Sequence, residues 1–124
     1  MEQKVCLDTD VVIAILNDEE RAAKVLDTIE DTEVFITTIT LFELLLRETN
    51  LEPIEQLRER VQLLPFDEIA SRKASYLFKD LRKKGKITDI RDVFIAATII
   101  TNQCSLTTFN RKHFEHIKGL KLVC

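Results

Sequence analysis

An apolar segment near the start of the chain, KVCLDTDVVIAIL at residues 4–16, is interrupted by two carboxylates, Asp8 and Asp10. The residues before the first carboxylate predict a short buried strand, and those after the second predict the start of a helix. A charged side chain at such a junction destabilises the fold unless a hydrogen-bond donor or a cation meets it. The segment therefore favours folds in which a strand ends at a helix and an acidic site lies between them.

Strand and helix patterns alternate along the rest of the chain. Parallel strands need helical connections, so the alternation predicts an α/β domain with a mainly parallel sheet and helices on both faces. Asp18 is the expected N-cap of the second helical segment, and Pro65 places the third strand at a sheet edge. We expect residues 1–124 to form this single domain. Further strands are expected at residues 33–38, 61–66, 104–108 and 120–124, and helices at 18–30, 41–49, from 53, at 67–84, 90–102 and 110–117.

The composition argues against several classes of protein. No apolar run approaches the roughly 20 residues needed to cross a bilayer, and the early carboxylates interrupt any signal-peptide core. Three widely spaced cysteines suit a reducing compartment, and two histidines without a CxxC pair argue against zinc. A net charge of −3 gives no general attraction to nucleic acid. We therefore expect a cytoplasmic protein whose contacts with any polyanion use a local basic patch.

Three acids and one amide occupy related positions in this pattern. Asp8 directly follows the first strand, and Glu43 and Asp92 each lie in the first turn of a predicted helix. Asn110 follows the strand at residues 104–108. In open α/β sheets, ligands bind beyond the carboxyl ends of the strands. The four side chains are therefore expected to meet at one edge of the sheet.

Each acid also has a purely structural interpretation. Asp8 can cap the first helix. Thr40 and Glu43 have the spacing of a capping box, and Asp89 can cap the helix in which Asp92 occupies the first turn. Capping explains each acid separately, but it does not explain why all three are expected at the same edge.

Converging carboxylates repel one another and raise one another's pKa unless a cation lies among them. An all-oxygen set of ligands suits Mg²⁺ or Mn²⁺ and not zinc or copper. Such an ion activates water and neutralises charge during phosphoryl chemistry. The sequence contains neither GxSxG nor GxxxxGK[ST], which would indicate a serine nucleophile or a P-loop. The acids therefore predict metal-dependent hydrolysis of a phosphate ester.

Four stretches of the chain, in order, resemble the motifs of the PIN-domain family, and in particular its small VapC-like toxin ribonucleases. CLDTDVVIAIL resembles the opening motif, ITLFELLL the second and RDVFIAATII the third, and LTTFNRKHFEHIKGLKLV is similar to the closing stretch. The resemblance covers essentially the whole chain. It implies a three-layer α/β/α sandwich and a Mg²⁺- or Mn²⁺-dependent endoribonuclease, the toxin of a toxin–antitoxin pair, that cleaves RNA with metal-activated water.

The resemblance also assigns roles to residues. Asp8, Glu43 and Asp92 become the catalytic, metal-binding acids, Asn110 becomes a further metal ligand, and Thr108 orients the first acid.

The chain departs from the family pattern at the fourth acid. The two positions that often supply it hold Asn110 and His113, and Asp10 stands where the family usually has asparagine. Asp10, Asp89 or His113 each remains a candidate for the missing acid. The departure also keeps open an alternative function, a PIN-like module that binds RNA or protein without catalysis.

Basic residues gather just before the third acid. Residues 79–91 (KDLRKKGKITDIR) hold six of them, of which Lys86 and Arg91, together with Arg111, are expected to contact RNA phosphates. The alternative is that the cluster at residues 82–84 only complements a helix C-terminus. With no Trp and one Tyr, the composition predicts no stacking platform for bases.

The resemblance implies two protein partners, a cognate antitoxin and a second copy of the chain. In the family an antitoxin helix enters a groove, for which the apolar helix positions Val12, Ile15 and Leu44–Leu46 are candidates. Of these, we expect Leu44 to belong to the core.

Overall fold

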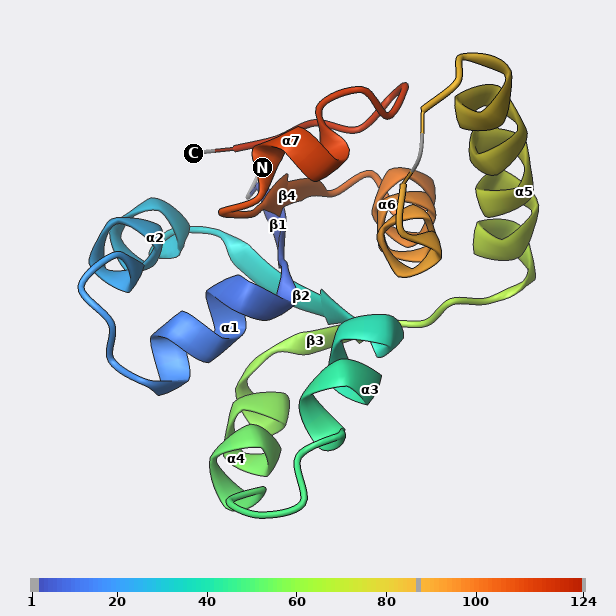
Figure 1. The fold of residues 1–124 in the computed structure, drawn as a ribbon. Helices are drawn as coiled ribbons and strands as arrows, with labels where there is room; N and C mark the ends of the chain where they lie inside the picture. Colours follow the sequence, from blue (N-terminus) through green and yellow to red (C-terminus); the bar gives the residue numbers. More distant parts are fainter. Residues whose placement is uncertain (1–2, 87, 124) are drawn as a thin grey trace.

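The computed structural model describes residues 3–86 and 88–123. Within those residues one parallel sheet of four strands, in the order β3-β2-β1-β4, is surrounded by seven helices (Figure 1). The strands are β1 (Lys4–Leu7), β2 (Glu33–Thr37), β3 (Gln62–Leu64) and β4 (Ser105–Thr107). The helices are α1 (Thr9–Leu16), α2 (Ala22–Ile29), α3 (Thr38–Leu45), α4 (Glu52–Arg60), α5 (Glu68–Lys83), α6 (Ile90–Thr101) and α7 (Arg111–Phe114).

The register of the sheet aligns the carboxyl ends of its strands. Leu7 pairs with Thr107 across β1 and β4, and Thr37 pairs with Leu64 across β2 and β3. The residues that follow these strands therefore emerge at one edge. β3 occupies an outer position of the sheet, as Pro65 predicted.

Side chains alternate between the two faces of the sheet and build a core on each. Val5, Leu7 and Ile36 pack on the face covered by α1 to α4, whereas Cys6 and Phe35 pack on the face covered by α5, α6 and α7. Figure 1 shows α5 and α6 on the opposite side of the sheet from α1 and α4. The predicted three-layer α/β/α sandwich is therefore confirmed.

Helix α3 begins three residues earlier than the sequence pattern indicated. Thr37 is its N-cap, and the Thr37 hydroxyl accepts the Thr40 N–H at 3.1 Å. The β-branched run from Thr37 to Thr40 favours a strand, but the cap ends the strand at Thr37. The predicted capping box of Thr40 and Glu43 is therefore wrong, and Glu43 lies in the second turn of the helix.

Asp18 does not cap α2, and this prediction is also wrong. It has a positive φ of 52° and follows the C-cap of α1. The Asp18 N–H donates to Ile15 O and the Glu19 N–H to Ala14 O, which is the pattern of a Schellman motif. A short polar side chain tolerates this left-handed position, so Asp18 ends one helix and does not begin the next.

The end of the chain forms less sheet than expected. Residues 120–124 were expected to form a strand, but within the described residues only an isolated parallel bridge joins Leu122 to Leu106. Cys6 and Cys104 are buried free thiols, and Cys124 lies outside the described residues. In the part of the chain that the structure covers, no helix has both the length and the apolar character needed to span a membrane.

Candidate active site

Asp8 lies where β1 passes into α1, and both of its carboxylate oxygens accept hydrogen bonds. Oδ1 accepts the Thr9 N–H at 2.9 Å, so Asp8 caps α1. Oδ2 accepts the Thr108 hydroxyl at 2.8 Å, a contact that follows from the pairing of β1 with β4. With 6% of its surface exposed, Asp8 is held in a fixed orientation from two elements. Asp8 therefore has both predicted roles: it caps α1 through Oδ1, and Thr108 orients it through Oδ2.

Glu43 connects three helices at the same edge of the sheet. Its Oε1 accepts the Thr9 hydroxyl of α1 at 2.8 Å, and its Oε2 lies 3.3 Å from Arg91 Nη1 of α6. Thr9 stands between the two acids of the opening motif, and no role was predicted for it. Its position between Asp8 and Asp10 was the only signal that could have indicated one. Glu43 therefore faces the region between α1 and α6.

Asp92 reaches this region from the first turn of α6. Its Oδ2 lies 3.4 Å from His113 Nδ1 of α7. Asp89 is the N-cap of the helix and accepts the Arg91 N–H at 2.8 Å. Asp89 also pairs with the Arg91 guanidinium, with 3.4 Å between Nη2 and Oδ2. Asp89 thus serves as a cap, while His113 lies against the third acid instead of pointing only into solvent.

Asp10 and Asn110, two positions at which the chain departs from the family pattern, contact each other. The Asn110 side-chain amide donates to Asp10 Oδ2 at 2.7 Å. The Asn110 N–H also donates to the Thr108 hydroxyl at 3.0 Å, which ties the residue to the partner of Asp8. An additional carboxylate, that of Asp10, is therefore present at this edge although residue 110 is an amide.

The carboxylates influence one another electrostatically. Burial raises the pKa of Asp8, and the charges of Asp10 and Glu43 add to the increase, while hydrogen bonds from Thr108 and Thr9 oppose it. Burial, followed by the charges of Asp8 and Asp89, raises the pKa of Asp92 to about 6. The sheet edge thus gathers more negative charge than its own surroundings neutralise.

Protein cations partly offset this charge. Among the described residues, no three His, Cys, Asp or Glu side chains are drawn together into a preformed metal cage. Arg91 lies against Glu43 instead, and His113 against Asp92. The donor set nevertheless consists of carboxylate oxygens and an amide oxygen, which are the ligands that Mg²⁺ and Mn²⁺ prefer. The residues therefore fit a hard divalent cation by their chemistry.

The three basic residues expected to contact phosphate have different surroundings. Arg91 lies among the acids, and nearly half of its side-chain surface is exposed. Arg111 is exposed at the first position of α7. Lys86 follows Gly85 at the end of α5 and lines a separate hollow with Arg82. Only Arg91 is therefore in direct contact with the acids.

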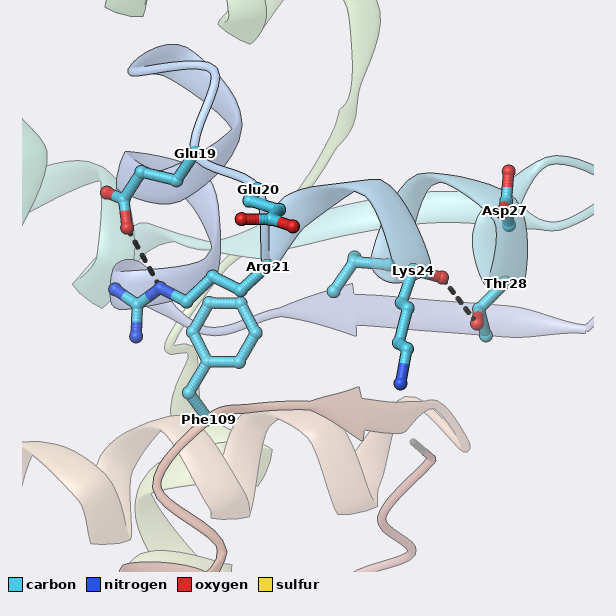
Figure 2. A pocket seen from close by; sticks show the side chains of 8 residues that line it. Glu19, Glu20, Arg21, Lys24, Asp27, Thr28 and Phe109 are labelled. Carbon is cyan, nitrogen blue, oxygen red and sulfur yellow. Dashed lines mark hydrogen bonds and ion pairs between the residues drawn. The ribbon is translucent and has the colours of Figure 1, made fainter.

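A hollow of about 890 Å³ lies away from the acids, between α2 and the segment after β4 (Figure 2). Its lining combines acidic and basic side chains, and the Arg21 guanidinium lies over the Phe109 ring, 4.3 Å from the ring centre. A hollow of about 140 Å³ adjoins Asp92 and is lined also by Lys112, His113 and His116. Of the acids at this edge, Asp92 and Asp89 therefore line a small, polar recess.

Comparisons with known proteins agree with this arrangement. The model of the PIN domain matches residues 5–120. Ribonuclease VapC1 of Methanocaldococcus jannaschii is 29% identical over 98% of this chain and 88% of its own length. Ribonuclease VapC3 of the same organism is 36% identical over 73% of this chain and 93% of its own length. The crystal structure of VapBC2 from Rickettsia felis, bound to a DNA fragment from their promoter, superposes with a TM-score of 0.84 at 20% identity and 98% coverage of both chains.

Proposed function

The chain belongs to the PIN domain family, and on this premise we propose that it is a Mg²⁺- or Mn²⁺-dependent endoribonuclease, the toxin of a toxin–antitoxin pair. The relatives named VapC ribonucleases support the reaction class. The observation that carries the proposal is that Asp8, Glu43 and Asp92 lie on three elements at the carboxyl edge of the sheet, close enough for the charges of Asp8 and Glu43 to contribute to the rise in the pKa of Asp92 to about 6.

Asp8, Glu43 and Asp92 would hold the ion, with the Asn110 side-chain oxygen as a further ligand. A bound divalent ion supplies Lewis acidity that activates water and offsets charge at the phosphate. Thr108 positions Asp8 through its hydroxyl, and Thr9 positions Glu43 in the same way. These hydrogen bonds leave the carboxylates little rotational freedom, so little order has to be gained when a ligand binds.

Basic side chains would position the RNA. Arg91 pairs with Glu43 through Nη1 and with Asp89 through Nε and Nη2, and nearly half of its side-chain surface is exposed, so a phosphate would share the guanidinium with these carboxylates. Lys86 and Arg111 are exposed and would contact phosphates farther along the strand.

We also propose an antitoxin as protein partner and a homodimer as the assembly, both acting in the cytoplasm. Leu44 is buried, as expected, whereas the prediction that Val12 lines the groove is wrong, because Val12 is fully buried in the core. The outer face of α3 exposes Phe42, Leu45 and Leu46, with 54%, 40% and 59% of their surface accessible. Apolar side chains gathered on one helix face favour a protein contact. The similarity to the solved VapBC2 structure supports an antitoxin as the partner, and the exposed apolar face of α3 is our proposed site for it.

RNA cleavage by the purified protein in Mg²⁺, Mn²⁺ and EDTA tests the proposal. We expect cleavage that requires metal, and a loss of at least about 100-fold in Asp8→Asn and in Asp92→Asn, because each removes a metal-binding carboxylate. Asp27→Asn, on the exposed surface of α2, serves as the control. Absence of cleavage over several RNAs, together with no metal-induced rise in melting temperature, would instead identify a non-catalytic binding module.

A further inference from the structure

Three adjoining hollows lead away from Asp92 along the α5–α6 side of the molecule. The first, of about 140 Å³, contains Asp92 and ends at Thr88. Thr88 also lines the second hollow, of about 460 Å³. Phe78 and Arg82 are shared by the second hollow and the third, which measures about 420 Å³. The shared lining residues place the three hollows next to one another in a row, and we name this row the α5–α6 track.

The charged side chains that line the second and third hollows are all basic. They are Lys79, Arg82 and Lys86, and no described carboxylate lines either hollow. Lys84, by contrast, lies on the same stretch of chain but pairs with Asp80 at 2.9 Å. The chain as a whole has a net charge of −3, so this local excess of positive charge is a feature of the track. Such a lining complements the phosphates of a nucleic acid strand.

An exposed aromatic ring lies in the middle of the track. Phe78 has 37% of its surface accessible, and the Arg82 guanidinium lies 5.6 Å from the centre of its ring. Within the described residues Arg82 has no ion-pair partner. Unpaired bases stack on aromatic rings and on guanidinium planes without strong sequence preference. The pair therefore has the chemistry of a base-stacking platform, which the low aromatic content did not predict.

The end of α5 holds these groups in place. Gly85 has a positive φ of 69°, its N–H donates to Arg82 O at 3.1 Å, and the Lys86 N–H donates to Leu81 O at 2.9 Å. This Schellman motif turns the chain back, so Lys86 lies beside the last turn of α5. A helix C-terminus alone would also attract basic residues, but that effect applies equally to Lys83, which does not line the hollows.

We propose that the α5–α6 track binds single-stranded RNA next to the scissile phosphate. One base stacks on Phe78 and Arg82, while Lys86 and Lys79 contact phosphates. The inference rests on the proposed ribonuclease function and adds to it the path of the strand and a positioning element outside the acid site.

Binding of a labelled single-stranded RNA of mixed sequence in EDTA separates this role from catalysis. We expect Phe78→Ala to raise Kd about 5- to 100-fold without changing the salt dependence, because it removes stacking and no charge. Arg82→Lys keeps the charge and loses the planar group, so it should also raise Kd at an unchanged salt slope. Lys86→Gln should lower the slope of log Kd against log salt by about 0.7. In Mg²⁺ the same variants should raise KM more than they lower kcat.

The chain provides matched controls. Tyr76 is an exposed aromatic residue of the same helix with Lys73 near its ring, and it does not line the track, so Tyr76→Ala should bind RNA like the wild type. Lys83→Gln controls for the charge of the helix terminus. Far-ultraviolet circular dichroism of each variant verifies folding.

Two results would overturn the proposal while the ribonuclease function stands. In the first, the wild type cleaves RNA, but Phe78→Ala and Arg82→Lys bind RNA as tightly as the control Tyr76→Ala does. The other is variants that bind RNA normally but no longer bind a protein partner, which would make the track a protein interface. If the wild type neither binds nor cleaves RNA, the proposed function itself fails, and this inference fails with it.

Discussion

Two hollows of this molecule contain an arginine lying over a phenylalanine, and their surroundings differ. In the α2 hollow, Arg21 covers Phe109 and is held by Glu19, with 2.9 Å between Nε and Oε1 (Figure 2). In the α5–α6 track, Arg82 lies near Phe78 and no carboxylate among the described residues pairs with it. The arginine is thus neutralised by a carboxylate in the α2 hollow, whereas in the α5–α6 track it is available to an anion.

A short segment after β4 explains why only one of these regions adjoins the acids. Thr108 and Asn110 direct their polar groups to Asp8 and Asp10, whereas Phe109, between them, packs against the core on the α1–α4 face. Phe109 lies in a bend after the end of β4, which separates its side chain from those of its two polar neighbours. Proximity to the carboxylates, and not the arginine–aromatic pair itself, therefore distinguishes the candidate RNA path from the α2 hollow.

The largest expected difference between the regions concerns the stability of the metal-free protein. Because the folded pKa of Asp92 is about 6 and its ordinary value is 3.8, the folded state takes up a proton more readily over this interval. The contribution of Asp92 to stability is therefore most favourable below pH 3.8 and declines as the pH rises to about 6. We expect Asp92→Asn to raise the free energy of unfolding by about 2 kcal/mol near pH 7.5, with little effect near pH 4.

Urea unfolding in EDTA at several pH values checks this expectation. Asp27→Asn in the exposed lining of the α2 hollow is the matched control and should change stability by less than about 0.5 kcal/mol at any pH. If the two variants changed the free energy of unfolding equally at every pH, the two regions would not differ electrostatically.

A smaller effect separates the two phenylalanines. Phe109 is half-buried against the core on the α1–α4 face, so Phe109→Ala should cost about 1.5 kcal/mol of unfolding free energy. Phe78 is exposed, and Phe78→Ala should cost less than about 0.7 kcal/mol. Chemical denaturation of both variants measures the difference. Equal losses would mean that Phe78 is a structural residue as well, which would weaken its assignment to the track.

The sheet and most helices could be predicted because they depend on local patterns. Apolar residues recur every second position in a strand and every third or fourth position in a helix, and these patterns depend on neighbouring residues alone. The same holds for the junction between strand and helix at Asp8. The start of α3 was misplaced because Thr38 and Ile39 favour strand locally, and only the cap formed by Thr37 decides otherwise. The expected edge for the acids followed from the rule for parallel sheets.

The details of the site could not be predicted, because they depend on packing between distant segments. Arg91 contacts Glu43 only because α6 packs next to α3, and the two residues are separated by much of the chain. The Phe78–Arg82 platform depends on the Schellman motif at Gly85 and on the shape of the α5–α6 surface. Composition alone, with few aromatic residues, pointed away from such a platform.

The smallest expected effect tests the acid side of the segment after β4. Asp10→Asn and Asn110→Asp each disturb the 2.7 Å hydrogen bond between these side chains, whereas exchanging both residues restores one donor and one acceptor. Because Asp10 is exposed, we expect a coupling energy of only about 0.5 to 1 kcal/mol in a double-mutant cycle of urea unfolding. The exchanged protein should also retain metal-dependent RNA cleavage, because the number of carboxylates at the edge is unchanged. Additive losses of stability would mean that Asn110 is held by Thr108 alone, and a loss of cleavage in the exchanged protein would mean that the site depends on the carboxylate being at position 10.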